Sequence, residues 1–298
     1  MRESELLEHI AIRSQGLTAG AGWEVVVGPG DDCAVLRSPG GDLSLLTVDQ
    51  LVAGRHFEVG TDLDLVARKA VARSVSDIAA MGGVPAWGMA TGLLPKGYND
   101  GDALFDAMAK WANHFGCPLV GGDVATHASD QHPLTLTVTV GGSMTDQTEP
   151  VLRSGAKAGD QVWLTAPVGG SFASGRHLTF EPRVALGQAL ARAGAHAMID
   201  LSDGVGRDAD RIGRASGVAI EIDSDRVPLH AEVADWRTGV AEGEDYELLV
   251  VGAPTLARAV PGLLGPIGRV RDGDPGACFV DADGSVHAAG EMGWDHGS

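Results

Sequence analysis

Acidic side chains follow apolar stretches at several separate places in this 298-residue sequence. Two adjacent aspartates stand in "GPGDDCAVL", a glycine-rich turn that leads into an apolar run, although a turn needs only one of them. Acids beside a strand-like run or a Gly pair recur along the chain, at Asp31, Asp32, Asp49, Asp77, Asp123, Asp200, Asp203, Glu244 and Asp245. One such acid alone is typical of a turn or a helix cap, so the argument depends on their joint occurrence.

Acids gathered at strand ends would repel one another, and a buried unpaired carboxylate usually becomes neutral. A hard cation removes this conflict, because Mg²⁺ prefers oxygen ligands and commonly binds one or two protein carboxylates together with waters and phosphate oxygens. The pattern therefore predicts several Mg²⁺ ions that bridge a polyphosphate. At least one of Asp31 and Asp32 is expected to face these ions, and the spacing leaves open whether the other serves the turn or a second metal.

The charge balance and the missing motifs narrow the class of site. The net charge is −18 and the chain has only four lysines, so no binding to a nucleic acid backbone is expected. An anionic ligand would need metal ions or backbone N–H groups for much of its counter-charge. The sequence contains no GxxxxGK[ST] loop, no GxGxxG opening a helix after the first strand, and no protein-kinase motif set. A nucleotide site here would have to depend on metals.

Cysteine usage and hydropathy indicate the compartment. Cys33, Cys117 and Cys278 are widely spaced and form no CxxC pair, which argues against a disulfide framework or a zinc site. The first ten residues have acids where a signal peptide has bases, and no apolar run reaches the ~18 residues of a membrane span. A cytoplasmic protein without membrane contact is expected.

The elements that would position the acids alternate between helices and strands. Apolar periodicity predicts helices over 3–15, 64–83, 101–115, 183–193 and 205–216. Strand patterns cover 33–37, 43–48, 86–94, 118–120 and 134–142, and then "QVWLTA", "HAMIDLSDG", "VAIEID", "YELLVV" and "GPIGRV". This alternation favours an α/β or α+β protein. A stretch with several turn-forming residues, "SMTDQTEPVLRSGAKAGD", predicts a domain boundary near 148 and so two domains, residues 1–148 and 149–298.

Short motifs follow one another over nearly the whole chain: "GPGDDCAVL", "TVDQLVAGRHF", "SVSDIAAMGGVPAW", "LVGGDVA", "RSGAKAGD", "HAMIDLSDG", "GEDYELL" and "GWDH". In this order they resemble the thiamine-monophosphate kinase family of the AIR synthase and selenophosphate synthetase superfamily. The resemblance implies a two-domain AIR-synthase-like fold, with an N-terminal mixed sheet in a dimeric β-barrel-like core and a C-terminal α/β domain. It also implies a homodimer that converts ATP and thiamine monophosphate to ADP and thiamine diphosphate with several Mg²⁺ ions.

The resemblance also implies roles for positions that match a family motif. Those for Mg²⁺ binding are Asp32, Thr47, Asp49, Asp77, Asp123, Asp200 and Asp203. Those for ATP binding are Gly122, Arg153 and Ser202, and those for thiamine monophosphate are His56, Glu244 and Trp294. Because the acceptor is already a phosphate and is anionic near neutral pH, direct in-line transfer needs no dedicated catalytic base.

Some positions depart from the family pattern, and two other functions stay open. Val124 and Ala125 follow "GGD" where hydroxyl residues are usual, Ser74 stands where Asn is common, and Glu242 stands where a Gly is usual. The alternatives are another ATP-dependent synthetase of the superfamily and a non-catalytic nucleotide- or metal-binding module. A selenophosphate synthetase would have a reactive Cys in a mobile N-terminal segment, whereas Cys33 lies within a strand-like run.

Overall fold

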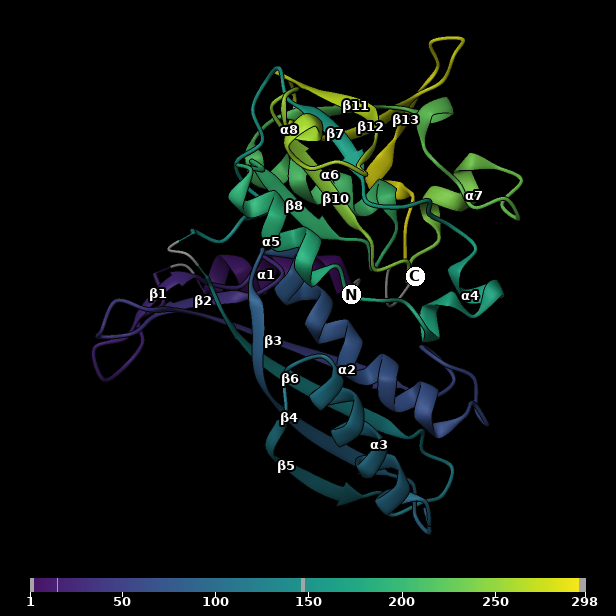
Figure 1. Cartoon of the computed structure of the whole chain (residues 1–298). Coiled ribbons are helices and arrows are strands. Elements are labelled where there is room, and N and C mark those ends of the chain that lie inside the picture. The colour runs from purple at the N-terminus through teal and green to yellow at the C-terminus, as the bar shows by residue number, and fades with distance from the viewer. Residues whose placement is uncertain (1–2, 15, 146–147, 295–298) are drawn as a thin grey trace.

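The computed structural model describes residues 3–14, 16–145 and 148–294, which form two mixed β-sheets with helices (Figure 1). The first sheet has the order β1-β2-β3-β6-β4-β5. Its strands are β1 (Glu24–Val27), β2 (Ala34–Arg37), β3 (Leu43–Val52), β4 (Val84–Leu94), β5 (Leu119–Thr126) and β6 (Thr135–Ser143). β4 and β5 run parallel, and the other neighbours are antiparallel.

Helices cover one face of this first sheet, namely α2 (Leu63–Ala80) and α3 (Gly101–His114), while α1 (Glu3–Arg13) precedes it. The alternation in β6 explains the one-sided cover, because Leu136 and Val138 are buried under the helices while the threonines between them face the other side. Asp62 caps the N-terminus of α2, and its Oδ1 accepts a hydrogen bond from the Asp64 backbone N–H at 2.8 Å. Most α2 side chains are buried, since the helix packs between both halves of the chain.

The second sheet has the order β13-β12-β9-β11-β7-β10-β8. Its strands are β7 (Gln161–Leu164), β8 (Ala197–Asp200), β9 (Ala219–Asp223), β10 (Leu248–Gly252), β11 (Leu264–Arg271), β12 (Gly276–Val280) and β13 (Val286–Ala288). β9 and β12 are parallel, and the other pairs are antiparallel. β10 is apolar throughout because both of its faces are buried, with Leu249 in one core and Val250 in another.

The second half also contains the helices α4 (Ser171–Ser174), α5 (Val184–Arg192), α6 (Val205–Ser216), α7 (Trp236–Ala241) and α8 (Leu256–Ala259). Short 3₁₀ turns are η1 (Arg176–Leu178), η2 (Ser224–Arg226) and η3 (Ala289–Glu291). α6 packs against one face of the second sheet, through Ile212, while α5 packs on the opposite face through Leu190. Over the described ranges, no helix is long and apolar enough to cross a membrane.

The two halves meet along α2, which contacts α5 and β8 (Figure 1). Close approach depends on glycine, because a Cβ built on Gly187 of α5 would lie 2.1 Å from the Ala79 carbonyl oxygen of α2. The first sheet uses only residues 24–143 and the second only 161–288. This separation is compatible with the predicted division at 148, which stays a prediction.

The expected elements are present, with changes in their extent. The strand expected over 118–120 is β5, which continues to Thr126, so the "GGD" motif lies inside a strand rather than at its end. β3 likewise continues beyond Asp49 to Val52. The sequence analysis did not predict β1, β12, β13 or the short helices α4, α7 and α8. Elements of three to six residues are too short to show a periodicity.

Candidate active site

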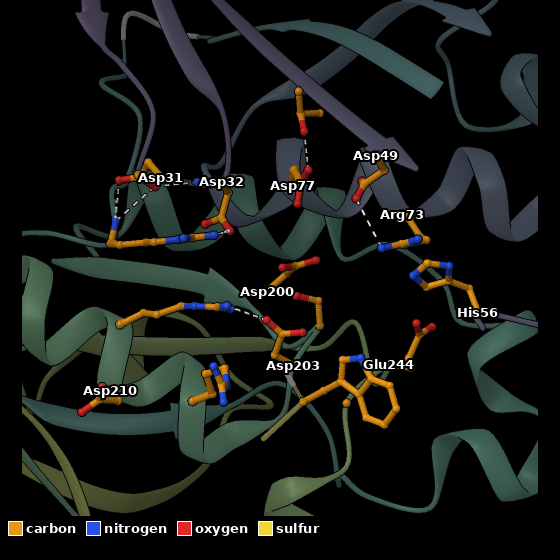
Figure 2. A pocket seen from close by; sticks show the side chains of 18 of the residues that line it. Asp31, Asp32, Asp49, His56, Arg73, Asp77, Asp200, Asp203, Asp210 and Glu244 are labelled. Carbon is orange, nitrogen blue, oxygen red and sulfur yellow. Dashed lines mark hydrogen bonds and ion pairs between the residues drawn. The ribbon is translucent and has the colours of Figure 1, made fainter. Parts of the chain in front are cut away.

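An open cleft with a volume of ≈ 1630 Å³ lies where the two halves of the chain meet (Figure 2). Eleven of the thirteen predicted site residues line it: Asp32, Thr47, Asp49, His56, Asp77, Arg153, Asp200, Ser202, Asp203, Glu244 and Trp294. They come from the β1–β2 loop, from β3 and the loop after it, from α2, from the segment between the sheets, and from the end of β8 and loops later in the chain. Segments up to 262 residues apart therefore share one cavity, large enough for two small ligands.

Three carboxylates form the centre of this cleft. Asp32, Asp77 and Asp200 each offer an oxygen, and these oxygens lie within 4.8 Å of one another. Asp77 accepts a short hydrogen bond from the Thr47 hydroxyl, and Asp200 accepts one of 2.6 Å from the Ser76 hydroxyl. Since Ser76 and Asp77 are adjacent on α2, this helix contributes one acid and orients another from the second sheet.

The electrostatics of this acid triad (Asp32, Asp77 and Asp200) favour a bound cation. Desolvation, and then the charge of Asp49, raises the pKa of Asp77 well above its ordinary value. Desolvation and the neighbouring Asp32 do the same to the pKa of Asp200. The Asp32 Oδ2 atom is buried and has no hydrogen-bond partner among the described residues. An all-oxygen set with a buried, unsatisfied carboxylate oxygen is the kind of site that Mg²⁺ binds.

Asp31 has a different environment from its neighbour Asp32. Its carboxylate accepts hydrogen bonds from the backbone N–H groups of Arg153, at 3.0 Å, and Asp32, at 3.0 Å. Burial, together with the charge of Asp32, raises the pKa of Asp31 to about 6. The Arg153 side chain pairs with Asp32 Oδ1 at 2.6 Å. Both aspartates line the cleft, but Asp31 fixes the backbone of the turn and of the connecting segment, whereas Asp32 belongs to the acid triad at the centre.

Two further predicted acids flank the triad, each paired with an arginine. Asp49 on β3 lies 3.4 Å from Arg73 Nη2 and accepts a hydrogen bond from Ser74 Oγ at 3.2 Å. Ser74, a departure from the family pattern, therefore supports a predicted metal ligand. Asp203 pairs with Arg211 Nη2 at 2.5 Å. In Figure 2 these acids lie on opposite sides of the cleft, around Asp77 and Asp200.

The predicted substrate residues lie at another end of the same cleft, where Figure 2 shows His56 and Glu244 close together. The buried His56 ring accepts, through Nδ1, a hydrogen bond from the Val52 backbone N–H at 2.9 Å. Glu244 has φ +70°, and its backbone N–H donates to the Ser202 carbonyl at 2.8 Å. The exposed Trp294 ring lies under the Arg55 guanidinium, whose Cζ is 5.3 Å from the ring centroid. An acid and an aromatic face are suited to a cationic ring.

Gly122 and Asp123 are the two predicted site residues that do not line the cleft. Asp123 is exposed on β5, and its partner across the strands is Thr91, whose own partner on β6 is Thr137. Side chains of paired residues share a face, so Asp123 lies on the side of the first sheet opposite the helices. The glycine at 122 has a structural cause, since a Cβ there would lie 1.9 Å from the Ala90 carbonyl oxygen.

The sequence reasoning missed a group of arginines in the cleft. Beside the predicted Arg153, the described lining residues include Arg55, Arg73, Arg207, Arg211 and Arg214. Three of them are on α6, where spacings of four and three residues place them on one side of the helix. That spacing is a readable signal in the sequence, although the lysine count of four does not reveal it. Arginine side chains therefore add to the counter-charge that metals and backbone N–H groups were expected to supply.

Comparisons with known proteins identify the family of this chain. A family model of the AIR synthase related protein N-terminal domain matches residues 30–144. The thiamine-monophosphate kinase of Escherichia coli K12 is 34% identical over 313 residues, which cover 92% of each chain. That of Caulobacter vibrioides is 32% identical and covers 97% of this chain and 90% of its own.

Solved structures extend the likeness to the fold. The structure described as AaThiL complexed with AMPPCP and TMP is 27% identical, covers 99% of each chain and superposes with a TM-score of 0.82. The HypE–HypF complex, at 18% identity and a TM-score of 0.71 over 95% of this chain and 98% of that one, shares the fold. The level of identity and the coverage of the curated relatives decide the matter: this chain belongs to the thiamine-monophosphate kinase family.

Proposed function

We propose that this chain transfers the γ-phosphoryl group of ATP to the phosphate of thiamine monophosphate, giving ADP and thiamine diphosphate. The observation that supports this most is the single cleft that contains both the acid triad and the His56–Glu244 end, in a member of this kinase family. A related structure, 27% identical, is described as complexed with AMPPCP and TMP. One cavity with these two ends suits two phosphorylated ligands that react with each other.

Mg²⁺ is the cofactor that the acid triad fits. Asp32, Asp77 and Asp200 would hold it, and the buried Oδ2 atom of Asp32 is a ready ligand atom. Thr47, Asp49 and Asp203 would complete the predicted set within the cleft. When bound, several Mg²⁺ ions would neutralise negative charge on the transferred phosphoryl group and on the oxygens of the leaving group.

The residues of the chain position the two substrates around this centre. Arg153 and the α6 arginines line the cleft beside Ser202 and would supply positive charge near the phosphates of ATP, although most of them are paired with carboxylates in this structure. The Glu244 carboxylate and the Trp294 ring favour the cationic thiazolium of thiamine monophosphate. The acceptor phosphate is already anionic, so in-line attack needs alignment and exclusion of water rather than removal of a proton.

The second copy of the chain is expected to cover the helix-free face of the first sheet. Exposed apolar side chains stand on it, with Val48, 63% exposed, and Met89, 42% exposed, both paired with Thr139 across three strands. These exposed apolar side chains support a homodimer with a β-barrel-like core. Val48 also lines the cleft, so a partner on this face would adjoin the site and bring its own Asp123 near it.

The proposed reaction can be tested with the purified protein, ATP, Mg²⁺ and thiamine monophosphate, by following ADP and thiamine diphosphate together. Equimolar products, lost in Asp77→Asn and retained in the exposed control Asp272→Asn, are expected. ADP without thiamine diphosphate would indicate another synthetase of the superfamily. Bound ATP without turnover in the wild type would instead indicate a non-catalytic module.

A further inference from the structure

A lysine with no exposed surface lies beneath the substrate end of the cleft. Lys69, on α2, is 0% exposed, and its ammonium group contacts three polar atoms from three other segments. It lies 2.5 Å from Glu244 Oε2, donates to the His56 carbonyl oxygen at 2.5 Å, and lies 2.7 Å from Nδ1 of His177. Two of these contacts are hydrogen bonds, to the His56 carbonyl oxygen and to His177 Nδ1, and the third is an ion pair with Glu244. A buried lysine is costly to place, and two of its partners here, His56 and Glu244, are predicted substrate residues.

The protonation states around Lys69 agree with this contact pattern. Burial lowers the pKa of Lys69 to about 8, although Glu244 acts to raise it, so the ammonium form predominates near neutral pH. Burial and the charge of Lys69 lower the pKa of His177 to about 4, so its ring is neutral and its Nδ1 can accept the hydrogen bond. The pair with Glu244 is then charged, and the contact with His177 is a directed hydrogen bond.

The contact with His177 extends to an aromatic side chain in the cleft. The Phe172 ring stacks on the His177 ring, with centroids 4.1 Å apart and an interplanar angle of 11°. Phe172 lines the cleft and is 43% exposed, so part of its ring is open to the cleft, and Lys69 Nζ lies 5.6 Å from the ring centroid. A flat aromatic ring that rests on a histidine suits stacking with a heteroaromatic ring.

The backbone conformation of Glu244 explains why its side chain needs a fixed partner. Its φ of +70° is rare for a residue with a side chain, and such conformations persist only where the surroundings enforce them. The ion pair with Lys69 fixes the carboxylate from below, and the hydrogen bond to Ser202 fixes the backbone.

We propose that Lys69 is a positioning residue for the acceptor substrate: it sets Glu244, the His56 turn and, through His177, the Phe172 ring in the arrangement that receives the rings of thiamine monophosphate. The proposal deepens the proposed function and rests on it. It assigns Phe172 as one wall of the ring pocket. Lys69 acts through its neighbours and does not touch the reacting phosphates.

The test is steady-state kinetics with each substrate varied in turn, in the wild type and in Lys69→Met, which keeps an unbranched side chain, one atom shorter, and removes its charge. The expected result is an increase of about tenfold or more in KM for thiamine monophosphate, with KM for ATP and kcat within about threefold of wild type. A loss of kcat with an unchanged KM for thiamine monophosphate, or an equal rise in both KM values, would overturn the assignment. Absence of turnover in the wild type would be a failure of the proposed function instead.

A double-mutant cycle shows whether Lys69 acts through Glu244. The double variant Lys69→Met with Glu244→Gln should have a KM for thiamine monophosphate close to that of the worse single variant, because the two share one interaction. A rise in KM equal to the product of the two single rises would contradict this.

Should Lys69→Met fail to fold, Phe172→Leu tests the same pocket at an exposed position. It should raise the KM for thiamine monophosphate by about threefold or more, whereas Phe172→Tyr should not. An unchanged KM in Phe172→Leu would remove the ring from the pocket.

Discussion

At the scale of single residues, Asp77 lies among carboxylates that oppose its charge. Asp49, Asp200 and Asp32 all act on it within the cleft. We expect Asp77→Asn to lower turnover by about 100-fold or more, because the metal ions that neutralise the transferred group lose a ligand. The melting temperature without Mg²⁺ should stay equal or rise, since repulsion is relieved, and its increase on addition of Mg²⁺ should be smaller than in the wild type. Scanning calorimetry with and without Mg²⁺ measures both, and a destabilised variant would contradict the argument.

Asp245 gives a prediction that concerns stability and pH. It is 6% exposed and accepts hydrogen bonds from the Gly169 backbone N–H, and burial raises its pKa to about 7. Between the unfolded pKa, about 4, and the folded value the native state binds the extra proton, so this group lowers stability as the pH rises through that window. Asp245→Asn retains an acceptor for Gly169 and removes the charge.

The free energy of unfolding of Asp245→Asn should therefore rise relative to wild type from pH 5 to pH 8, by an amount on the order of 1–3 kcal/mol. Urea titrations at the two pH values measure the difference. The exposed Asp272→Asn variant should show no comparable change. A constant difference between Asp245→Asn and wild type at both pH values would contradict the burial argument.

The sequence allowed the acids of the cleft to be proposed, because an acid beside an apolar run is visible in one dimension. It could not separate Asp31 from Asp32, since that difference depends on the Arg153 backbone, 122 residues later in the chain. Nor could it indicate Lys69, whose partners come from three other segments. Contacts between distant segments leave no local pattern, so the roles of the individual site residues stay predictions.

At the scale of elements, the crossing of α2 and α5 depends on the absence of one methyl group. A Cβ on Gly187 would lie 2.1 Å from the Ala79 carbonyl oxygen, and a backbone atom cannot move aside as a flexible side chain can. Gly187→Ala gains about 1 kcal/mol of helix propensity, but overpacking costs about 1–3 kcal/mol. We expect a net loss of stability in urea unfolding. The control Gly20→Ala, with no heavy atom within 4 Å, should be close to neutral, and a stabilised Gly187→Ala would contradict the crossing.

The long elements were predictable because their periodicity extends over several turns or pleats, as in α2 and β6. β5 was the important exception. Its glycines and Asp123 predict the end of a strand, whereas the strand continues through them to Thr126. Glycine in a strand marks close backbone approach as well as a turn, and Gly122 is explained by the Ala90 carbonyl. The direction of the Asp123 side chain follows from register, which a single sequence does not specify.

At the scale of the whole molecule, the cleft is incomplete with respect to the predicted set, because Asp123 faces away from it on the helix-free side of the first sheet. That face is apolar at Val48 and Met89, and Val48 borders the cleft. A homodimer through this face would resolve the discrepancy, since Asp123 of one copy would serve the site of the other. The hypothesis predicts that neither Asp77→Asn nor Asp123→Asn alone is active.

Co-expression of the two variants should then restore activity. In a mixed dimer, one site has both substitutions and the other has neither, so a random mixture should recover about a quarter of the wild-type rate, because half of the dimers are mixed and each has one intact site of two. The two variants, purified separately and combined without subunit exchange, provide the baseline. No recovery above that baseline would mean that Asp123 acts within its own chain. An active Asp123→Asn variant would mean that the residue has no part in the reaction. The same experiment therefore tests the dimer and the role of Asp123, because only a shared site can be rebuilt from two inactive chains.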